Sequence, residues 1–268
     1  GVPTHTQTSY VSNNKNCANG IADCGIVTAS GLTAGKEYKY RVRTINSTSV
    51  ASEWLDVGSN GNNADFTIVG TAVGFELISG DAQTGTVGQL LANPLEAKLI
   101  DANGFGVPNE TVSWTILTGA GSLPQKSTQS DEFGNLSASW QLGTVSGINN
   151  NTLRLSKTGV AGTLTITASA TPDIVATYIL TVPSIVQKNT NFSITINAVD
   201  KFNNAVPVND ALTLSAVLID GNTPGNGTLA PTSVNLVAGT VTLSTVNYTN
   251  SEVIKIKATN ALDANVFG

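Results

Sequence analysis

The chain has 268 residues and a formal net charge of −5, with 40% hydrophobic and 12% charged residues. This length corresponds to two or three domains of ordinary size. The acidic balance argues against nucleic acid and anionic lipid as partners, because both require a basic surface. No segment approaches the roughly 20 apolar residues of a membrane span. No window has a sustained apolar period of 3.6 residues, so we expect almost no helix.

The two cysteines of the chain, Cys17 and Cys24, lie near its start. Their spacing is too wide for a CxxC redox pair, and a single histidine leaves no partners for a zinc site. We therefore expect a disulfide that closes a small loop, with two buried free thiols as the alternative. A disulfide implies an oxidising compartment and hence export.

Residues 1–68 form the first predicted unit. Around Tyr38 and Val42, apolar and charged residues alternate, as in a half-buried strand. The segment resembles a fibronectin type III domain, because Leu32 and Tyr38 match a leucine and a tyrosine of that family's tyrosine corner. Ala34 stands where the family has proline. The resemblance implies a Tyr38 phenol bonded to nearby backbone. The unit is short for that fold, so we expect it to be incomplete at its start.

Residues 69–182 form the second predicted unit. The phrases GDAQTGTVG, NPL, DANGFGVP, VSW, GAGSL, DEFG and SWQLG follow one another in this order. They resemble the bacterial Ig-like domains of invasin and intimin stalks. Trp114 and Trp140 have apolar neighbours two positions away, so we place both in the core rather than on a sugar-binding surface.

Residues 183–268 form the third predicted unit, in which segments such as FSITINAVD and VTLSTVNY alternate as strands do. KLIDANGFGVP at 98–108 is echoed by NAVDKFNNAVP at 197–207. A repeat at about 100 residues indicates tandem β modules. The predicted fold class is therefore all-β, with tandem Ig-like and fibronectin type III-like antiparallel β-sandwiches.

Clustered oxygen atoms occur at three predicted turns. Asp101 and Asn103 lie in the first turn, Asp131 in the second and Asp200 in the third. Calcium takes six to eight oxygen ligands, so these residues are candidate ligands at a junction between modules. Asp and Asn also favour such turns for backbone reasons alone, and this interpretation stays open beside the calcium site. No other cofactor is expected.

No catalytic constellation can be assembled from the sequence, because His5 is the only histidine and no phosphate-binding loop is present. The resemblance to the Ig-like domains of invasin and intimin implies a segment of an exported bacterial surface protein, and we therefore expect a non-enzymatic stalk or adhesin located outside the cell. Its partners would be a protein or glycan at a surface, or neighbouring copies of itself. Two alternatives stay open: a self-assembling surface-layer or filament subunit, and accessory modules of a secreted polysaccharide-active enzyme.

Overall fold

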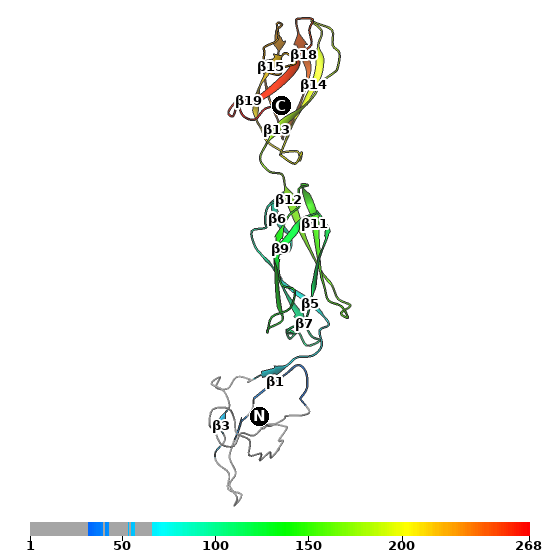
Figure 1. Ribbon diagram of the computed structural model, residues 1–268, viewed down its shortest axis with the longest axis vertical. Helices are drawn as coiled ribbons and strands as arrows, with labels where there is room; N and C mark the ends of the chain where they lie inside the picture. The colour runs from blue at the N-terminus through cyan, green and yellow to red at the C-terminus, as the bar shows by residue number, and fades with distance from the viewer. Residues whose placement is uncertain (1–31, 40, 43–52, 54, 57–65) are drawn as a thin grey trace, which may run out of the picture.

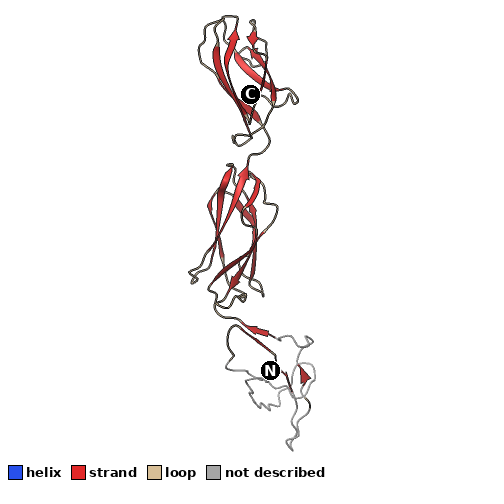
Figure 2. Cartoon of the chain, turned by 180° about the vertical axis from the view of Figure 1, so that it is seen from behind, coloured by secondary structure: helices blue, strands red, loops and turns tan. Residues whose placement is uncertain are grey.

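The computed structural model describes residues 32–39, 41–42, 53, 55–56 and 66–268. All helices and strands assigned in this part of the chain are β-strands (Figure 2). The second and third units follow one another along the longest axis of the structure (Figure 1). The fold class is all-β, with antiparallel β-sandwiches in tandem. No helix of the described residues has the length and apolarity of a membrane span.

The described part of the first unit contains two small antiparallel pairs. Strand β1 (Lys36–Tyr38) pairs with β4 (Phe66–Ile68), and β2 (Arg41–Val42) pairs with β3 (Leu55–Asp56). The rings of Tyr38 and Phe66 stack, with their centroids 5.7 Å apart. Cys17 and Cys24 lie outside the described residues, so their disulfide stays a prediction.

The second unit is a sandwich of two four-stranded sheets. The first sheet has the order β5-β7-β10-β9, with strands β5 (Gly74–Ser79), β7 (Leu95–Ile100), β10 (Asn135–Gln141) and β9 (Ser122–Lys126). The second sheet has the order β6-β12-β11-β8, with strands β6 (Gln83–Thr86), β12 (Leu164–Thr171), β11 (Gly147–Ser156) and β8 (Ser113–Thr118). All pairs are antiparallel except β6 with β12, which is parallel.

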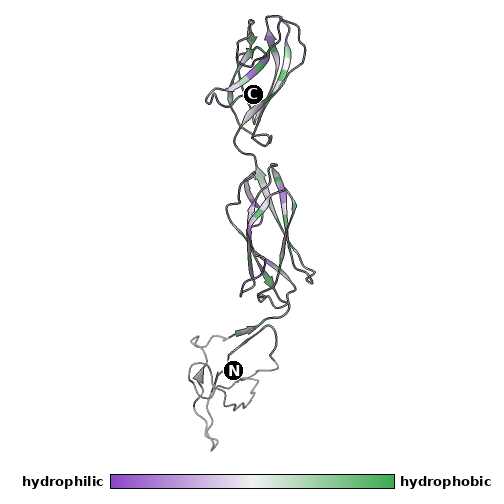
Figure 3. Cartoon of the chain, viewed as in Figure 1, coloured by the Kyte–Doolittle hydropathy of each residue, from purple (hydrophilic) through white to green (hydrophobic). Residues whose placement is uncertain are grey.

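The core of the second unit is built by alternation. Hydrophobic and hydrophilic residues alternate along its strands (Figure 3), and the hydrophobic set faces the opposite sheet. Trp140 is 1% exposed and Trp114 is 7% exposed. The indole N–H of Trp114 donates to the Ser127 carbonyl oxygen over 2.9 Å, whereas the Trp140 indole nitrogen has no hydrogen-bond partner. Both tryptophans therefore serve packing in the core.

The third unit has its own sandwich and its own core. One sheet has the order β13-β14-β18-β16, with strands β13 (Thr177–Thr181), β14 (Phe192–Val199), β18 (Thr240–Tyr248) and β16 (Leu229–Ala230). The other has the order β17-β15-β19, with strands β17 (Ser233–Asn235), β15 (Ala211–Val217) and β19 (Lys255–Asn260). The core residues of the two units form separate clusters.

The limit between the second and third units lies before the position expected from the sequence. Strand β13 pairs with β14 along its whole length, and Tyr178 is buried in the core of the third unit. The Tyr178 phenol donates to Asp210 over 2.7 Å and accepts from the Asn260 side chain over 2.8 Å. Strand β13 therefore belongs to the third unit, although the predicted boundary at 182–183 assigned it to the second. The strand follows β12 after a short segment, and alternation alone does not tell two consecutive strands apart.

Candidate linker-anchoring site

The turn at Asp101 begins where β7 ends. One carboxylate oxygen of Asp101 accepts the backbone N–H groups of Asn103 and Phe105, at 2.9 and 3.0 Å. The other oxygen accepts the backbone N–H of Gly70 over 2.7 Å. Gly70 lies in the segment that enters the second unit. Asp101 is only 2% exposed. A single buried carboxylate therefore fixes its own turn with one oxygen and the incoming chain with the other.

Asn103 of this turn lies against the first unit. A side-chain carbon on Gly35 would lie 2.4 Å from the Asn103 amide nitrogen, so the two residues are in close contact. Gly35 also has a φ of 76°, in the left-handed region that favours glycine. The turn that precedes β1 therefore packs directly on the Asp101 turn.

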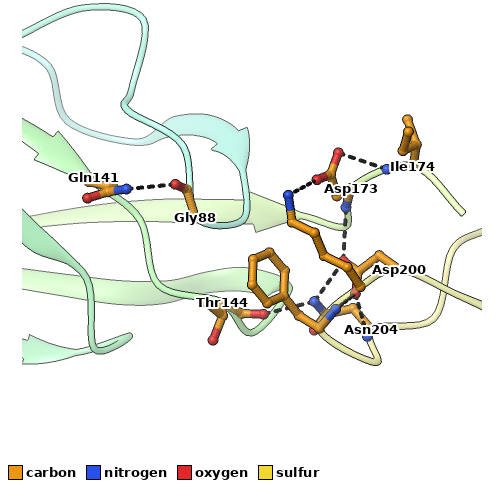
Figure 4. A network of polar contacts seen from close by, with 9 residues as sticks. Gly88, Gln141, Thr144, Asp173, Ile174, Asp200 and Asn204 are labelled. Carbon is orange, nitrogen blue, oxygen red and sulfur yellow. Dashed lines mark hydrogen bonds and ion pairs between the residues drawn. The ribbon is translucent and has the colours of Figure 1, made fainter. Parts of the chain in front are cut away.

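The turn at Asp200 repeats this arrangement after β14 (Figure 4). One oxygen of Asp200 accepts the backbone N–H groups of Phe202 and Asn204, at 2.8 and 2.9 Å. The other accepts the backbone N–H of Asp173, at 3.0 Å, in the segment that leaves β12. Asp200 is 1% exposed. The same residue type at the same place in the fold thus anchors the entering segment of two successive units.

The Asp200 turn also contacts the far end of the second unit. The Asn204 amide nitrogen donates to the Thr144 carbonyl oxygen, and the Asn204 amide oxygen accepts the Ser146 backbone N–H, both over 2.8 Å. A side-chain carbon on Gly88 would lie 3.3 Å from the Phe202 ring, so this ring rests on the Gly88 backbone. The Asn204 side chain therefore forms hydrogen bonds across the junction with both its amide nitrogen and its amide oxygen.

A salt bridge adds to the same junction. The Lys201 ammonium lies 2.9 Å from a carboxylate oxygen of Asp173, whose other oxygen accepts the Ile174 backbone N–H over 2.9 Å (Figure 4). The Lys201 side chain is 55% exposed, so water screens the ion pair and its contribution to stability is small. The hydrogen bonds at Asp200 and Asn204 rather than this ion pair define the junction.

The turn at Asp131, which precedes β10, has the same internal geometry without a junction. One Asp131 oxygen accepts the backbone N–H groups of Phe133 and Asn135, at 2.9 and 2.7 Å. The other accepts the Asn135 amide nitrogen over 3.0 Å. Asp131 is exposed, and the hydrogen bonds that its carboxylate accepts here come from residues within five positions. This turn is therefore a natural comparison for the two anchoring turns.

The carboxyl groups of these turns are ionised at neutral pH. Burial acts to raise the pKa of Asp200, but hydrogen bonds from the Asn204 side chain and from backbone N–H groups, including that of Asp173, outweigh it and place the pKa below its ordinary value. The same balance lowers the pKa of Asp101 and of Asp131. A charged acceptor makes each of these hydrogen bonds stronger than a neutral one.

The residues expected as calcium ligands lie in three turns: Asp101 and Asn103 in one, Asp131 in another and Asp200 in the third. In the part of the chain that the structure describes, no three His, Cys, Asp or Glu side chains gather to hold a metal ion. The carboxylate oxygens of these turns accept N–H groups. Calcium binding there stays a prediction, whereas the turn interpretation rests on observed contacts.

The Tyr38 phenol is bonded to backbone five residues before it. Its oxygen accepts the Thr33 backbone N–H over 2.7 Å, and the hydroxyl lies 3.4 Å from the Thr33 carbonyl oxygen. This contact closes the loop that carries Gly35 and so positions the loop that packs on Asn103.

A second polar cluster lies at the opposite end of the third unit. The Tyr248 phenol donates to the Glu252 carboxylate, which also accepts the Asn226 backbone N–H and amide nitrogen, each over 2.8 Å. The hydrogen bond from Tyr248, followed by that from Asn226, lowers the pKa of Glu252 to about 2. Sequence reasoning missed this cluster, because Asn226 lies 26 residues before Glu252 and their proximity depends on the fold.

The stability of the third unit should fall on acidification below the ordinary Glu252 pKa of 4.5. Because the folded-state pKa is depressed, the contribution of Glu252 is fully present above pH 4.5 and is lost as the pH falls towards about 2. Urea unfolding of the third unit at a series of pH values checks this. Glu252→Gln should make the loss between these values shallower, and an unchanged slope in this variant would contradict the assignment.

Of the comparisons with known proteins, only the comparison with solved structures found similar proteins. No protein-family model matches the chain, and no curated protein matches it. The D0–D1 domain of intimin shares 13% identity, with a TM-score of 0.28, over 72% of this chain and 92% of that one. The Escherichia coli adhesin FdeC shares 15%, with a TM-score of 0.37, over 77% and 68%. InvD of Yersinia pseudotuberculosis shares 13%, with a TM-score of 0.39, over 86% and 82%.

The fold and the junction contacts define the class of the molecule. It is an all-β protein in which antiparallel sandwiches follow one another, each with a separate core. At the start of both described sandwiches, a buried aspartate holds the segment that enters.

Proposed function

We propose that the chain is a non-enzymatic stalk segment of a large exported bacterial surface protein, which spaces and presents binding regions. The observation that carries this proposal is the anchoring of successive units by Asp101 and Asp200. Each carboxylate binds the backbone of the entering segment, and Asn204 bonds the end of the preceding sandwich. Bending at a junction breaks these specific contacts, so short, hydrogen-bonded segments resist bending. Modules joined in this way give reach.

The proposal assigns a part to each unit. Residues 1–68 are a fibronectin type III-like unit, an interpretation supported by the bond between Tyr38 and the Thr33 backbone. The two units that follow are Ig-like sandwiches, and any surface protein or glycan that the chain binds would contact their end loops. The expected disulfide between Cys17 and Cys24 and the low charge content suit an extracellular location.

Sedimentation and small-angle X-ray scattering at several concentrations test the proposal. We expect a monomer of constant mass, with an elongated particle whose maximum dimension does not change on dilution. A mass that rises with concentration would contradict the stalk and favour the self-assembling subunit. A compact particle of monomer mass would contradict the spacing function as well.

A further inference from the structure

The sequence contains four Asn–Gly dipeptides, which begin at Asn19, Asn60, Asn103 and Asn226. Glycine places no side chain between its own backbone nitrogen and the carboxamide of a preceding asparagine. This nitrogen can attack the asparagine Cγ and expel ammonia, and the cyclic imide that forms takes up water to give aspartate or isoaspartate. Asn103 and Asn226 lie in the part of the chain that the structure describes, so their surroundings can be compared.

The dipeptide Asn103–Gly104 lies in the turn at Asp101 and is open to solvent. Both residues are exposed, and a side-chain carbon on Gly104 would meet no atom within 4 Å. The Gly104 N–H donates to the Asp101 carbonyl oxygen over 3.1 Å, a bond inside the turn itself. The Gly104 backbone can therefore approach the Asn103 carboxamide without displacing a packed neighbour.

The dipeptide Asn226–Gly227 is held in place by its neighbours. The backbone N–H and the amide nitrogen of Asn226 both donate to the Glu252 carboxylate, each over 2.8 Å. The Gly227 N–H donates to the Tyr248 phenol over 2.8 Å, and a side-chain carbon on Gly227 would lie 2.6 Å from the Tyr248 ring. Ring closure at Asn226 has to break these contacts, which makes this dipeptide an internal reference for Asn103.

Conversion of Asn103 would change the surroundings of the Asp101 carboxylate. Burial acts to raise the pKa of Asp101, but backbone hydrogen bonds, that of Gly70 first, and a hydrogen bond from the Asn103 side chain hold it below its ordinary value. An acidic residue at position 103 lacks this amide donor and places a second negative charge beside the buried carboxylate. Isoaspartate also adds a carbon atom to the main chain and so displaces the Phe105 N–H, which bonds Asp101.

We propose that Asn103–Gly104 is a site of spontaneous deamidation, and that its product weakens the junction between the first and second units. The reaction replaces the NH₂ group of the Asn103 side chain by OH, consumes one molecule of water and releases one of ammonia. The same Asp101 carboxylate holds the Gly70 backbone, and the Asn103 side chain lies against Gly35 of the first unit. The modified residue therefore acts on both contacts of this junction.

The junction between the second and third units has a different residue at this point. Phe202 follows Asp200 by two positions, as Asn103 follows Asp101, and the backbone N–H of each donates to the aspartate. Phe202 rests on Gly88 and has no carboxamide to lose. Deamidation of this kind thus distinguishes the first junction from the second and loosens it as the protein ages. This inference goes beyond the stalk function and does not depend on it.

Incubation of the full chain at mildly alkaline pH, followed by peptide mapping with mass spectrometry, tests the reaction. Alkaline conditions favour it, because the attacking backbone nitrogen has to lose its proton. We expect Asn103 to be converted at least about tenfold faster than Asn226, whose reaction requires local opening of the fold. Asn103→Gln keeps a carboxamide but requires a larger ring, so its conversion should be at least as slow as that of Asn226.

Hydrogen exchange at the Gly70 backbone N–H tests the consequence. Asn103→Asp reproduces one of the two products and should accelerate this exchange by at least about fivefold. Asn135→Asp is the matched control, because the Asn135 amide donates to Asp131 in a turn that holds no entering segment. This control should leave exchange at Gly70 unchanged.

The proposal is overturned if Asn103 is converted no faster than Asn226. It is equally overturned if Asn103→Asp leaves exchange at Gly70 as in the unmodified chain, or if Asn135→Asp accelerates that exchange to the same extent. Because no readout concerns association or overall dimension, the result is independent of the test of the stalk.

Discussion

Replacing Trp140 by alanine should lower the free energy of unfolding of the second unit by about 3–5 kcal/mol. The indole is 1% exposed, lies on the inner face of β10 and is among the largest side chains of the core. Its removal forfeits the burial of a large apolar surface and leaves a cavity that the two facing sheets cannot close. Urea unfolding followed by circular dichroism, with hydrogen exchange to assign each transition to its unit, measures the loss.

The third unit and one exposed aromatic provide the controls for this prediction. Because the cores of the two units are separate clusters, the transition of the third unit should not move. Phe133→Ala, at a side chain that is 64% exposed, should change the stability of the second unit by no more than about 0.5 kcal/mol. A loss below about 1 kcal/mol for Trp140→Ala would show that the indole does not organise the core.

The core was accessible to sequence reasoning because its signal is local. Alternation with period two places Trp114 on one face with Val112 and Ile116, and the burial of Trp114 follows once that face meets another sheet. Glycine and asparagine after Asp101 and Asp200 indicate turns for an equally local reason, since one carboxylate oxygen bonds N–H groups two and four residues on.

The anchoring function of the same aspartates was not accessible, because its partners are distant in sequence. Gly70 lies 31 residues before Asp101, and Asp173 lies 27 residues before Asp200. Nothing in the local pattern tells Asp131, which holds only its own turn, from the two anchoring residues. The one available signal was the echo between 98–108 and 197–207, which places Asp101 and Asp200 at the same point of two units.

The boundary between the second and third units also depends on both local and distant interactions. The segment at Tyr178 alternates as a strand, so its existence follows from the sequence, but its sheet is decided by pairing with β14. The buried hydrogen bonds of Tyr178 to Asp210 and Asn260 join it to residues of the third unit. Only these contacts between residues distant in sequence show that the boundary lies before residues 182–183.

Replacing Asp200 by alanine should loosen the junction between the second and third units. The substitution removes the acceptor of three backbone N–H groups, those of Asp173, Phe202 and Asn204. Buried N–H groups that lose a charged acceptor are costly, so we expect the third unit to lose about 2–4 kcal/mol of stability. Hydrogen exchange at Asp173 should accelerate, and small-angle scattering should show a broader distribution of dimensions with the fold of the second unit retained.

Asp131→Ala is the matched control, because Asp131 holds an equivalent turn but bonds no segment that enters a unit. This exposed turn should lose about 1 kcal/mol, since water can replace the carboxylate at its N–H groups. Exchange at Asp173 and the scattering profile should stay as in the unmodified chain. If Asp200→Ala destabilises the third unit yet leaves both junction readouts unchanged, the carboxylate stabilises its own turn alone, and rigidity between the units must come from Asn204 and its bonds to Thr144 and Ser146.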